Sequence, residues 1–532
     1  MTQDTFLGRQ EYLDILEKRI RGLKEGYRQN IAIIGDELAG KSSIIFQFLN
    51  RFCDNRIIVM YLEIRPESLG SFSRRFAGVL LYNFLINSGI PLREDLDFLM
   101  DKSAKYIPRT VEKIKYIFSC VDKRKKNNVF TELLSLCDTF HEETGKYCAV
   151  IFDEFHHLEY MGIKELYKEW SKLLILQKTT LYIIVSSMKF KARQVLSKNL
   201  SLLFGNFEVL TVEPFDIKTS EEYIDYRLRD VEINPGLKDF LVHFTGGYPF
   251  YLKVIIEALL KSEEEAPAAI LENLLFEASG LLNQRFSAYL KRFLDSPYSQ
   301  DYISILRLIC EGNNKVKNIA QVLHKPKKEL MTQVNRLLEL DAVTRSGDFL
   351  KINDRVFGYW LKFVYQQKQS SLTFDAKNQK ALFRENIENM IRDFLDNAEK
   401  PVAERLAELL HLFSDDTVQI ERKRIRLDHF REVKPLQFGN RSLKDGLLGR
   451  SNASVWILGF KYDLLTEDDI ADFAKECKKY RNKLQRKIII ALRDIDTNAR
   501  LRAMEEKILT WDLSNLNQLF DLYSKPRLIV CE

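Results

Sequence analysis

Five short apolar runs, each rich in β-branched residues, alternate with longer amphipathic stretches in the first part of the chain. The runs cover residues 31–35, 56–64, 147–154, 181–187 and 207–215. Helical patterns separate them, which is typical of a parallel sheet with helices on both faces. The interval from Ser68 to Lys146 is almost wholly helical in pattern. We therefore predict an α/β fold whose parallel sheet carries a long helical insertion.

A different pattern follows residue 295. Residues 299–312, 316–325 and 327–341 predict three short helices, and residues 342–354 predict a hairpin turning at Ser346-Gly347-Asp348. Three helices followed by a hairpin predict a winged helix. The polar, Ser/Gln-rich stretch 366–380 predicts a linker.

Beyond the predicted linker the pattern again mixes helix and strand. Helices are expected at 383–395 and 466–481, with Thr466 as an N-cap, and strands at 418–427, 455–464, 487–494 and 527–532. A second α/β domain is therefore predicted.

The bulk composition narrows the protein's class. The chain has 532 residues, 45% of them hydrophobic and 29% charged, so we expect a globular protein of several domains. A net charge of +6 argues against wholesale coating of nucleic acid but permits local basic patches. The seven cysteines include no C-x-x-C pair, and no apolar run is long enough to span a bilayer. These features predict a cytoplasmic protein with no membrane contact.

The stretch IAIIGDELAGKSSIIF, residues 31–46, contains the phosphate-binding pattern G-x-x-x-x-G-K-[ST]. Its glycines let the backbone N–H groups wrap a polyphosphate, the lysine reaches the β and γ phosphates, and the first serine joins a Mg²⁺ shell. The alternative is a tight strand–helix turn with no ligand. The predicted nucleotide-binding residues are Gly35, Asp36, Glu37, Leu38, Ala39, Gly40, Lys41, Ser42 and Ser43.

Two further strand ends carry candidate chemistry. The run AVIFDEF places Asp153 to hold Mg²⁺, together with Ser42, and Glu154 to act as general base on the attacking water. His156 and His157 just beyond are expected to be polar junction residues rather than catalytic ones. Ser187, at the end of 181–187, either senses the γ-phosphate or only forms the turn. The predicted catalytic set is therefore Lys41, Asp153 and Glu154.

Motifs before and after the phosphate-binding stretch point to a particular family of proteins. FLGRQEYLDIL, with Gly8 and Arg9, and FTGGYPFYLKVI, with Gly247 and Pro249, accompany GDELAGKSS, VIFDEF and VEPFD. Over roughly residues 5–365 this set resembles the archaeal ATPase group of the STAND and AAA+-like P-loop NTPases. The resemblance implies an ATP/ADP-binding switch in which Gly8 and Arg9 lie beside the nucleotide and a lid bearing Pro249 closes on it.

The resemblance also implies a domain layout. The ATPase core covers 1–215 with its insertion at about 68–146, followed by a helical lid at 216–295, a winged helix at 296–365, the linker at 366–380, and a restriction-endonuclease-like domain at 381–532. One position departs from the family: Asn206 stands where an arginine often contacts phosphate. Slow turnover, or an arginine supplied from elsewhere, is therefore expected.

The C-terminal domain is predicted to be a degenerate, non-cutting nuclease. The family's metal site uses an acid and then E-x-K. Asp445 and Lys461 occupy the matching places, with Glu385 or Glu388 as a helical acid, but Gly459 replaces the glutamate and Asp463 lies on the wrong side of the lysine.

Two surfaces are candidates for nucleic acid. The third helix of the predicted winged helix carries Lys325, Lys327, Lys328 and Arg336 for phosphates and Gln333 for a groove; alternatively it packs on the nucleotide domain. An extended 418–427 would align Arg422, Arg424 and Arg426 on one face, as a phosphate-binding row or as a solvated edge.

The sequence predicts an ATP-hydrolysing molecular switch that requires Mg²⁺. Two alternatives stay open: an ATPase that binds or cuts nucleic acid, for example in defence against foreign DNA, and a homo-oligomeric scaffold controlled by nucleotide with little turnover.

Overall fold

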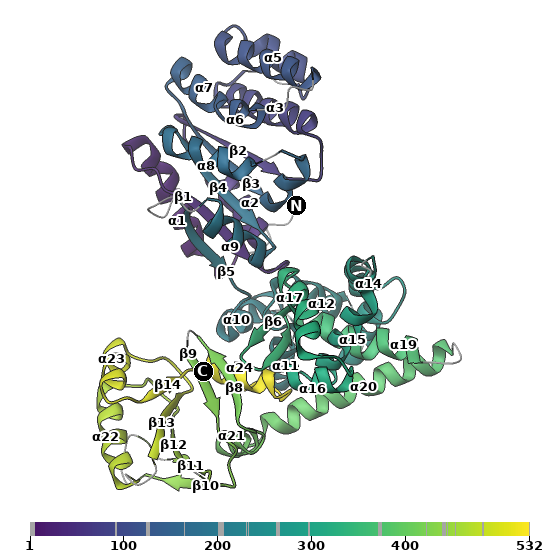
Figure 1. Cartoon of the computed structure of the whole chain (residues 1–532), viewed down its shortest axis with the longest axis vertical. Coiled ribbons are helices and arrows are strands. Elements are labelled where there is room, and N and C mark those ends of the chain that lie inside the picture. Colours follow the sequence, from purple (N-terminus) through teal and green to yellow (C-terminus); the bar gives the residue numbers. More distant parts are fainter. Residues whose placement is uncertain are drawn as a thin grey trace. The chain divides into compact units, whose positions relative to one another are not determined.

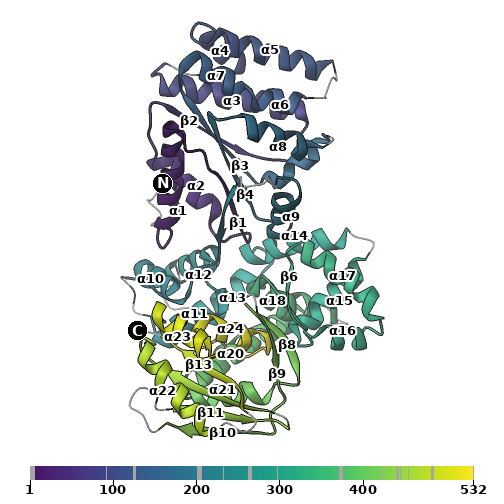
Figure 2. The same cartoon turned by 60° about the vertical axis from the view of Figure 1, so that its left-hand side comes forward.

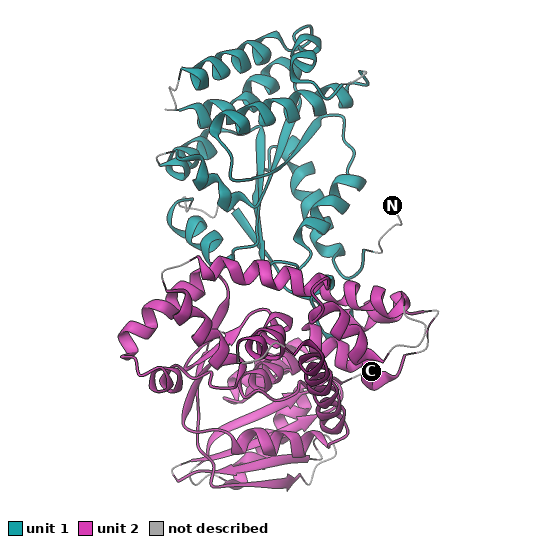
Figure 3. Ribbon diagram, turned by 90° about the vertical axis from the view of Figure 1, so that its right-hand side faces the viewer, with its two compact units in different colours: residues 1–219, 248–250 teal, residues 220–247, 251–532 magenta. Residues whose placement is uncertain are grey.

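The computed structural model describes residues 6–530, apart from 91–92, 124–127, 164, 201–206, 230, 232, 262–265, 296–297, 371–374, 422, 439–442, 444, 453 and 481–483. The chain forms two compact units (Figure 3). The first comprises residues 1–219 and 248–250, and the second comprises residues 220–247 and 251–532. Asn206 and Arg422, both of interest in the sequence, lie outside the described residues.

A five-stranded parallel sheet forms the centre of the first unit, in the order β2-β3-β4-β1-β5. Its strands are β1 (Asn30–Gly35), β2 (Ile57–Glu63), β3 (Tyr147–Asp153), β4 (Thr180–Ser186) and β5 (Phe207–Val212). The predicted parallel sheet and its five runs are confirmed. Residues of β1 and β4 are buried throughout, as the unbroken apolar runs indicate for strands covered on both faces.

Helices cover both faces of this sheet (Figures 1 and 2). Apolar side chains of α1 (Gln10–Gly22) and α2 (Lys41–Arg51) pack on one face. The opposite face shares one apolar cluster with α3 (Leu69–Asn87), α4 (Leu96–Ser103), α5 (Pro108–Asp122), α6 (Val129–Leu134), α7 (Leu136–Thr144), α8 (Leu166–Leu176) and α9 (Lys189–Lys198). In this cluster α4 and α5 pack on α3. The helical character predicted for 68–146 is thus present in α3 to α7.

The second unit begins with helices and a hairpin. Its elements are α10 (Ile217–Arg227, whose first turn belongs to the first unit), α11 (Pro235–Thr245), α12 (Pro249–Lys261, whose first two residues belong to the first unit), α13 (Pro267–Leu275), α14 (Leu281–Leu294), α15 (Ser299–Cys310), α16 (Val316–Val322), α17 (Lys327–Glu339), β6 (Val343–Ser346), β7 (Phe349–Ile352) and α18 (Arg355–Trp360). The three helices and the hairpin predicted for 299–354 are all present.

The stretch predicted as a linker is helical at its described ends. A π-helical turn at Leu361–Tyr365 leads into α19 (Gln366–Ser370), and α20 (Ala376–Ala398) begins at an Asp375 cap. The α20 helix packs on α13 through Phe383 and Phe276, whose ring centroids lie 5.5 Å apart. Its Arg384 also pairs with the buried Glu272 of α13 at 2.9 Å. The described residues on both sides of 371–374 are thus helical, and α20 packs on α13 through its apolar face.

A second five-stranded sheet, in the order β10-β11-β12-β13-β14, forms the C-terminal part. Its strands are β10 (Glu432–Gln437), β11 (Asp445–Arg450), β12 (Val455–Lys461), β13 (Leu484–Ala491) and β14 (Leu509–Trp511), and its helices are α21 (Val402–His411), α22 (Glu467–Cys477), α23 (Thr497–Glu505) and α24 (Leu513–Leu522). β10, β11 and β12 pair antiparallel, whereas β13 and β14 run parallel to β12.

Two strand predictions in this part are wrong. The run 418–427 is a tight hairpin of β8 (Asp416–Ile420) and β9 (Lys423–Leu427), in which Ile420 pairs with Lys423. Glu421 makes the turn possible by adopting a φ of +54°. Residues 527–530 form no strand: the Asn517 side chain accepts from the Leu528 N–H at 2.7 Å and donates to the Leu528 carbonyl at 2.8 Å.

The tip of the β6–β7 hairpin is covered by β8. The Asp348 N–H donates to the Thr417 carbonyl at 2.9 Å, and the Ser346 hydroxyl donates to the Gln419 carbonyl at 2.9 Å. Gly347, at φ +62°, permits this approach because a Cβ there would lie 2.1 Å from the Thr417 oxygen.

A buried ion cluster ties the C-terminal segment to this hairpin. The side chain of Asp521, on α24, is 2% exposed and contacts Lys351 of β7 at 2.5 Å, Arg355 of α18 at 3.0 Å and Arg527 at 2.8 Å. These cations hold the pKa of Asp521 well below its usual range despite burial. The hairpin, α18 and the C-terminal residues are therefore joined by one charge network.

Candidate nucleotide site

The phosphate-binding pattern forms the turn from β1 into α2. β1 ends at Gly35, where a Cβ would lie 2.2 Å from the Val212 carbonyl oxygen of β5. Gly40 precedes α2 at φ +96°, and Leu38 adopts φ +69° inside the loop. The glycines are thus required by a close approach at one end and by left-handed backbone at the other.

Lys41 points back into its own loop. Its Nζ donates to the carbonyls of Gly35 at 3.1 Å and Asp36 at 2.7 Å, and the residue is only 5% exposed. Burial lowers the pKa of the Lys41 amine, and the carboxylates of Glu154 and Asp153 oppose that shift. Because both of its partners are backbone carbonyls, the ammonium can exchange them for phosphate oxygens without leaving a side chain unpaired.

Ser42 and Asp153 meet although 111 residues separate them. The Ser42 hydroxyl donates to Asp153 Oδ2 at 3.1 Å, and the Tyr61 hydroxyl donates to the same oxygen at 2.9 Å. Asp153 is 3% exposed at the end of β3. The carboxyl ends of β1 and β3 therefore bring together the two residues predicted to hold a metal.

Glu154 is anchored by the end of β4. Its Oε2 accepts from the Ser187 N–H at 3.0 Å and from the Ser187 hydroxyl at 2.8 Å, while its backbone sits at φ +52°. Burial raises the pKa of Glu154, and the hydrogen bonds from Ser187 counteract that rise. Ser187 therefore orients the Glu154 carboxylate through two hydrogen bonds.

The two histidines beyond Glu154 have structural partners. His156 Nδ1 lies 2.9 Å from the Ser186 hydroxyl and 3.3 Å from Glu154 Oε2. Burial lowers the pKa of His156 to about 3, so its imidazole is neutral near pH 7. His157 donates to the Ile64 carbonyl at 2.9 Å.

Arg9 and Pro249 flank the loop. The Arg9 guanidinium donates to the Ala39 carbonyl at 3.4 Å and to the Glu213 carbonyl, and burial lowers its pKa. Gly8 precedes it at φ +66°. Pro249 lies within the first unit, and its Cγ would lie 4.0 Å from a Cβ on Gly40. Arg9 and Pro249, two of the residues that the family resemblance singled out, thus adjoin the phosphate loop.

The remaining loop residues differ in exposure. Asp36 pairs with Lys189 at 2.7 Å, whereas Glu37 and Ser43 are exposed. The sequence analysis missed Tyr61 and Lys189. Neither position carries a motif, although Lys189 follows the end of β4 by three residues and Tyr61 lies two before the end of β2.

The described residues contain no group of three or more His, Cys, Asp or Glu side chains that could hold a metal. A Mg²⁺ ion at this site would therefore depend on Ser42, Asp153, phosphate oxygens and water. That donor set, with one hydroxyl and one carboxylate, is the kind that Mg²⁺ takes beside a nucleotide.

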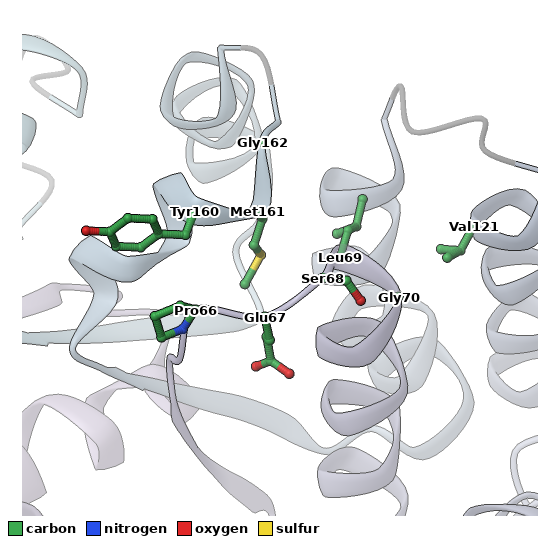
Figure 4. A pocket seen from close by; sticks show the side chains of 9 residues that line it. All are labelled: Pro66, Glu67, Ser68, Leu69, Gly70, Val121, Tyr160, Met161 and Gly162. Carbon is green, nitrogen blue, oxygen red and sulfur yellow. The ribbon is translucent and has the colours of Figure 1, made fainter.

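A cavity of about 740 Å³ lies elsewhere in the first unit, between the start of α3, the end of α5 and the 3₁₀ turn Phe155–Met161 (Figure 4). Tyr160 and Met161 project from that turn, and Glu67 lies at the start of α3. The Glu67 carboxylate is occupied, since it pairs with Arg75 and accepts from Ser71 at 2.8 Å. None of the described lining residues belongs to the predicted nucleotide site.

The C-terminal candidate residues do not converge. Gly446 of β11 pairs with Gly459 of β12, so Asp445 shares a face with Phe460, and Lys461 projects from the opposite face. Lys461 pairs there with the buried Asp469 at 3.0 Å. Asp445 and Lys461, which occupy the places matching the family's aspartate and lysine, therefore lie on opposite faces of the sheet in this antiparallel register.

The other candidates for that centre are also apart from it. Glu385 and Glu388 are exposed on α20, which packs on α11 and α13. A Cβ at Gly459 would meet the Phe473 ring at 3.0 Å, inside an apolar cluster.

Several residues predicted to bind nucleic acid make hydrogen bonds or ion pairs with acidic residues of this chain. Gln333, expected to enter a groove, is 6% exposed and donates to Asp301, so that interpretation is wrong. Lys325 pairs with Asp301 at 2.7 Å and Arg336 pairs with Glu339 at 2.8 Å. The exposed basic residues of these two surfaces are Lys327, Lys328, Arg336, Arg424 and Arg426, the last of which pairs with Asp415 at 3.1 Å.

Comparison with solved structures identifies the fold. The Walker-type ATPase PABY2304 of Pyrococcus abyssi matches with a TM-score of 0.50 and 20% identity, covering 68% of this chain and 97% of that one. The matched part therefore shares the fold of a P-loop ATPase.

The ORC2 protein of Aeropyrum pernix, solved as ADPNP-ADP complexes, matches with a TM-score of 0.40 and 10% identity over 73% of this chain and 97% of that one. RuvB of Thermotoga maritima, a Holliday junction branch migration motor, matches with a TM-score of 0.31 and 12% identity over 70% and 98%.

No family model matches the sequence, and no curated protein matches it. Among the described helices, none has both the length and the apolarity needed to cross a membrane.

Proposed function

We propose that this chain binds and hydrolyses ATP and works as a STAND-type molecular switch. One observation carries the proposal: the Ser42 hydroxyl meets the Asp153 carboxylate at 3.1 Å, between the Lys41 loop and Glu154. A strand–helix turn that binds no ligand does not require the Ser42 hydroxyl, the Asp153 carboxylate and the buried Lys41 to lie together. The fold shared with a Walker-type ATPase supports the same conclusion.

Nucleotide binding would use the loop first. The N–H groups between Gly35 and Lys41 face the phosphates in such a turn, and the Lys41 ammonium would exchange its carbonyl partners for phosphate oxygens. Arg9 and Pro249, which adjoin the loop, would limit the space for the rest of the nucleotide.

Ser42 and Asp153 would hold Mg²⁺, which supplies positive charge against the phosphate oxygens when bound. Tyr61 keeps Asp153 oriented because its hydroxyl already donates to one carboxylate oxygen. Burial makes the carboxylate's position well defined.

Glu154 would accept the proton of the attacking water at a carboxylate oxygen. Its raised pKa brings it closer to the range in which a carboxylate is an effective base. Ser187 holds Oε2 and leaves Oε1 as the oxygen better placed to take the proton.

The switch would couple nucleotide state to the segments after the core. Pro249 opens α12 and adjoins Gly40, so occupancy of the loop has a direct route to the proposed lid at 216–295. We further propose that α15, α16, α17 and the β6–β7 hairpin form a winged helix, and that residues 381–532 form a degenerate nuclease-like domain.

A second candidate function is nucleic-acid binding. It is favoured by the exposed Lys327 and Lys328 on α17 and by Arg424 and Arg426 on β9. The hairpin tip would take no part in it, because β8 covers that tip.

The decisive experiment measures ATP turnover and particle mass of the whole chain without nucleotide, with ADP and with a non-hydrolysable ATP analogue, each with and without DNA. The switch predicts turnover and a mass or shape that differs between ADP and the analogue. Nucleotide-dependent mass with negligible turnover would instead support the oligomeric scaffold. No nucleotide binding at all would refute the proposal.

A further inference from the structure

The phosphate loop contains two acidic residues, although it is proposed to bind negatively charged phosphates. Asp36 and Glu37 occupy two of the four positions between Gly35 and Gly40, where the backbone is meant to receive phosphate. Together with Asp153 and Glu154 they are the carboxylates whose fields act on Lys41. Four carboxylates around one buried ammonium make this a poor place for a polyphosphate unless another cation compensates.

Lys189 is placed to compensate. It is the first residue of α9, and its Nζ lies 2.7 Å from Asp36 Oδ2. The two side chains are 17% and 14% exposed, so solvent screens the pair only in part. The Asp36 carbonyl also accepts from Lys41, so Asp36 contacts both cations, one through its backbone and one through its side chain.

We propose that Lys189 is a positioning residue of the nucleotide site, which neutralises Asp36 and so keeps the loop receptive to phosphate. This inference rests on the proposed function and specifies how its phosphate site is balanced. Without Lys189, the Asp36 carboxylate repels the incoming phosphates and competes for Lys41.

The role predicts a particular dependence on ligand charge. Repulsion from an uncompensated carboxylate grows with the number of phosphates, so ATP affinity falls more than ADP affinity. A lysine needed only for folding would instead affect both nucleotides alike, through the fraction of folded protein.

The test measures the Kd for Mg²⁺·ATP and for Mg²⁺·ADP by calorimetry on the full chain and four variants. Lys189→Ala should weaken ATP binding about tenfold and ADP binding about threefold, whereas Lys189→Arg should bind nearly as the wild type does. Asp36→Asn combined with Lys189→Ala should restore most of the ATP affinity, because position 36 then carries no charge that Lys189 would have to neutralise.

The matched control is Lys191→Ala. Lys191 lies on the same helix but pairs at 2.7 Å with Glu159, a residue outside the loop, and its removal should leave both affinities unchanged. Thermal unfolding of every variant separates affinity from stability.

Three results would overturn the inference: unchanged ATP affinity in Lys189→Ala, equal losses for ATP and ADP, or no recovery in the double variant. Each leaves the proposed ATPase intact, provided the wild type binds ATP. A wild type that binds no ATP would instead refute the proposed function, and the role of Lys189 with it.

Discussion

The two sheets of this protein each present acids and a lysine near strand ends, yet only one gathers them. In the first unit, Ser42 and Asp153 follow parallel strands and meet at 3.1 Å. In the C-terminal sheet, Asp445 and Lys461 lie on neighbouring antiparallel strands but on opposite faces. Parallel strands bring their carboxyl ends to one edge whatever the register, whereas an antiparallel pair gathers side chains only if the parity matches.

The largest effect is expected at the first sheet. Glu154→Gln should keep ATP binding but lower turnover by about a hundredfold or more, because the amide cannot accept the water proton. Single-turnover hydrolysis with a parallel binding measurement checks this. Glu159→Gln, on the exposed turn beyond, is the control. Wild-type turnover in Glu154→Gln would remove Glu154 from the role of base.

The second prediction tests the other side of the comparison. Gly459→Glu should destabilise the C-terminal sheet by about 3 to 5 kcal/mol, because its carboxylate would enter the apolar cluster around Phe473. Gly459→Ala separates the effect of shape from that of charge. Denaturant unfolding with and without Mn²⁺ is the measurement. Stabilisation of Gly459→Glu by Mn²⁺ would show that residue 459 and Asp445 share a pocket after all.

The same register also bears on cleavage. We expect no Mg²⁺- or Mn²⁺-dependent cutting of single- or double-stranded DNA by the wild type, because Lys461 pairs with Asp469 on the face away from Asp445. Cleavage that disappears in Lys461→Ala would contradict this interpretation.

Lys41→Ala should weaken ATP binding by about ten- to a hundredfold, since it removes charge-assisted hydrogen bonds to phosphate. Equilibrium titration with a fluorescent ATP analogue measures it. Lys172→Ala, which pairs with Glu169 on the surface of α8, serves as the control. Full affinity in Lys41→Ala would mean that the loop holds no phosphate.

A smaller effect is expected from Ser187→Ala. The Ser187 hydroxyl favours the charged form of Glu154, so its loss raises the pKa of that carboxyl further. As pH falls, the reactive carboxylate is then lost at a higher pH than in the wild type. The pH dependence of turnover should therefore show its acid limb displaced upward, with little change on the plateau. An unmoved acid limb would show that another group controls it.

The smallest effect concerns DNA. Replacing Arg424 and Arg426 by alanine should reduce the slope of log Kobs against log salt by up to about two, one for each phosphate that an arginine no longer neutralises. Fluorescence anisotropy over a range of salt concentrations measures the slope. Lys434→Ala, whose lysine pairs with Glu432 on β10, is the control. An absence of wild-type DNA binding at low salt would make the arginines a solvated surface only.

Sequence patterns predicted the features that depend on short, contiguous stretches of the chain: the strands of the first sheet and the phosphate loop. The five runs of the first sheet are buried on both faces, so their apolar character is continuous and easy to recognise. The phosphate loop is likewise a local motif, and the strand ends that follow from a parallel sheet bring Asp153 to it.

The features that could not be predicted depend on the backbone angle of a single residue or on contacts between residues far apart in the sequence. One residue at positive φ, Glu421, divides a run of ten into a hairpin. Gln333 is drawn inward by Asp301, and the pairing of Lys189 with Asp36 spans 153 residues. The helices α19 and α20 at the described ends of the polar stretch 366–380 were also not predicted, because α20 packs through only a narrow apolar face.

The Asp521 cluster has a consequence for how the chain acquires its structure during synthesis. Lys351 leaves the ribosome 170 residues before the aspartate that neutralises it, a delay of roughly ten to thirty seconds at ordinary elongation rates. The first sheet, by contrast, has all its strands once Val212 has emerged. All strands of the first sheet are therefore available for pairing before the aspartate that neutralises Lys351 has been synthesised.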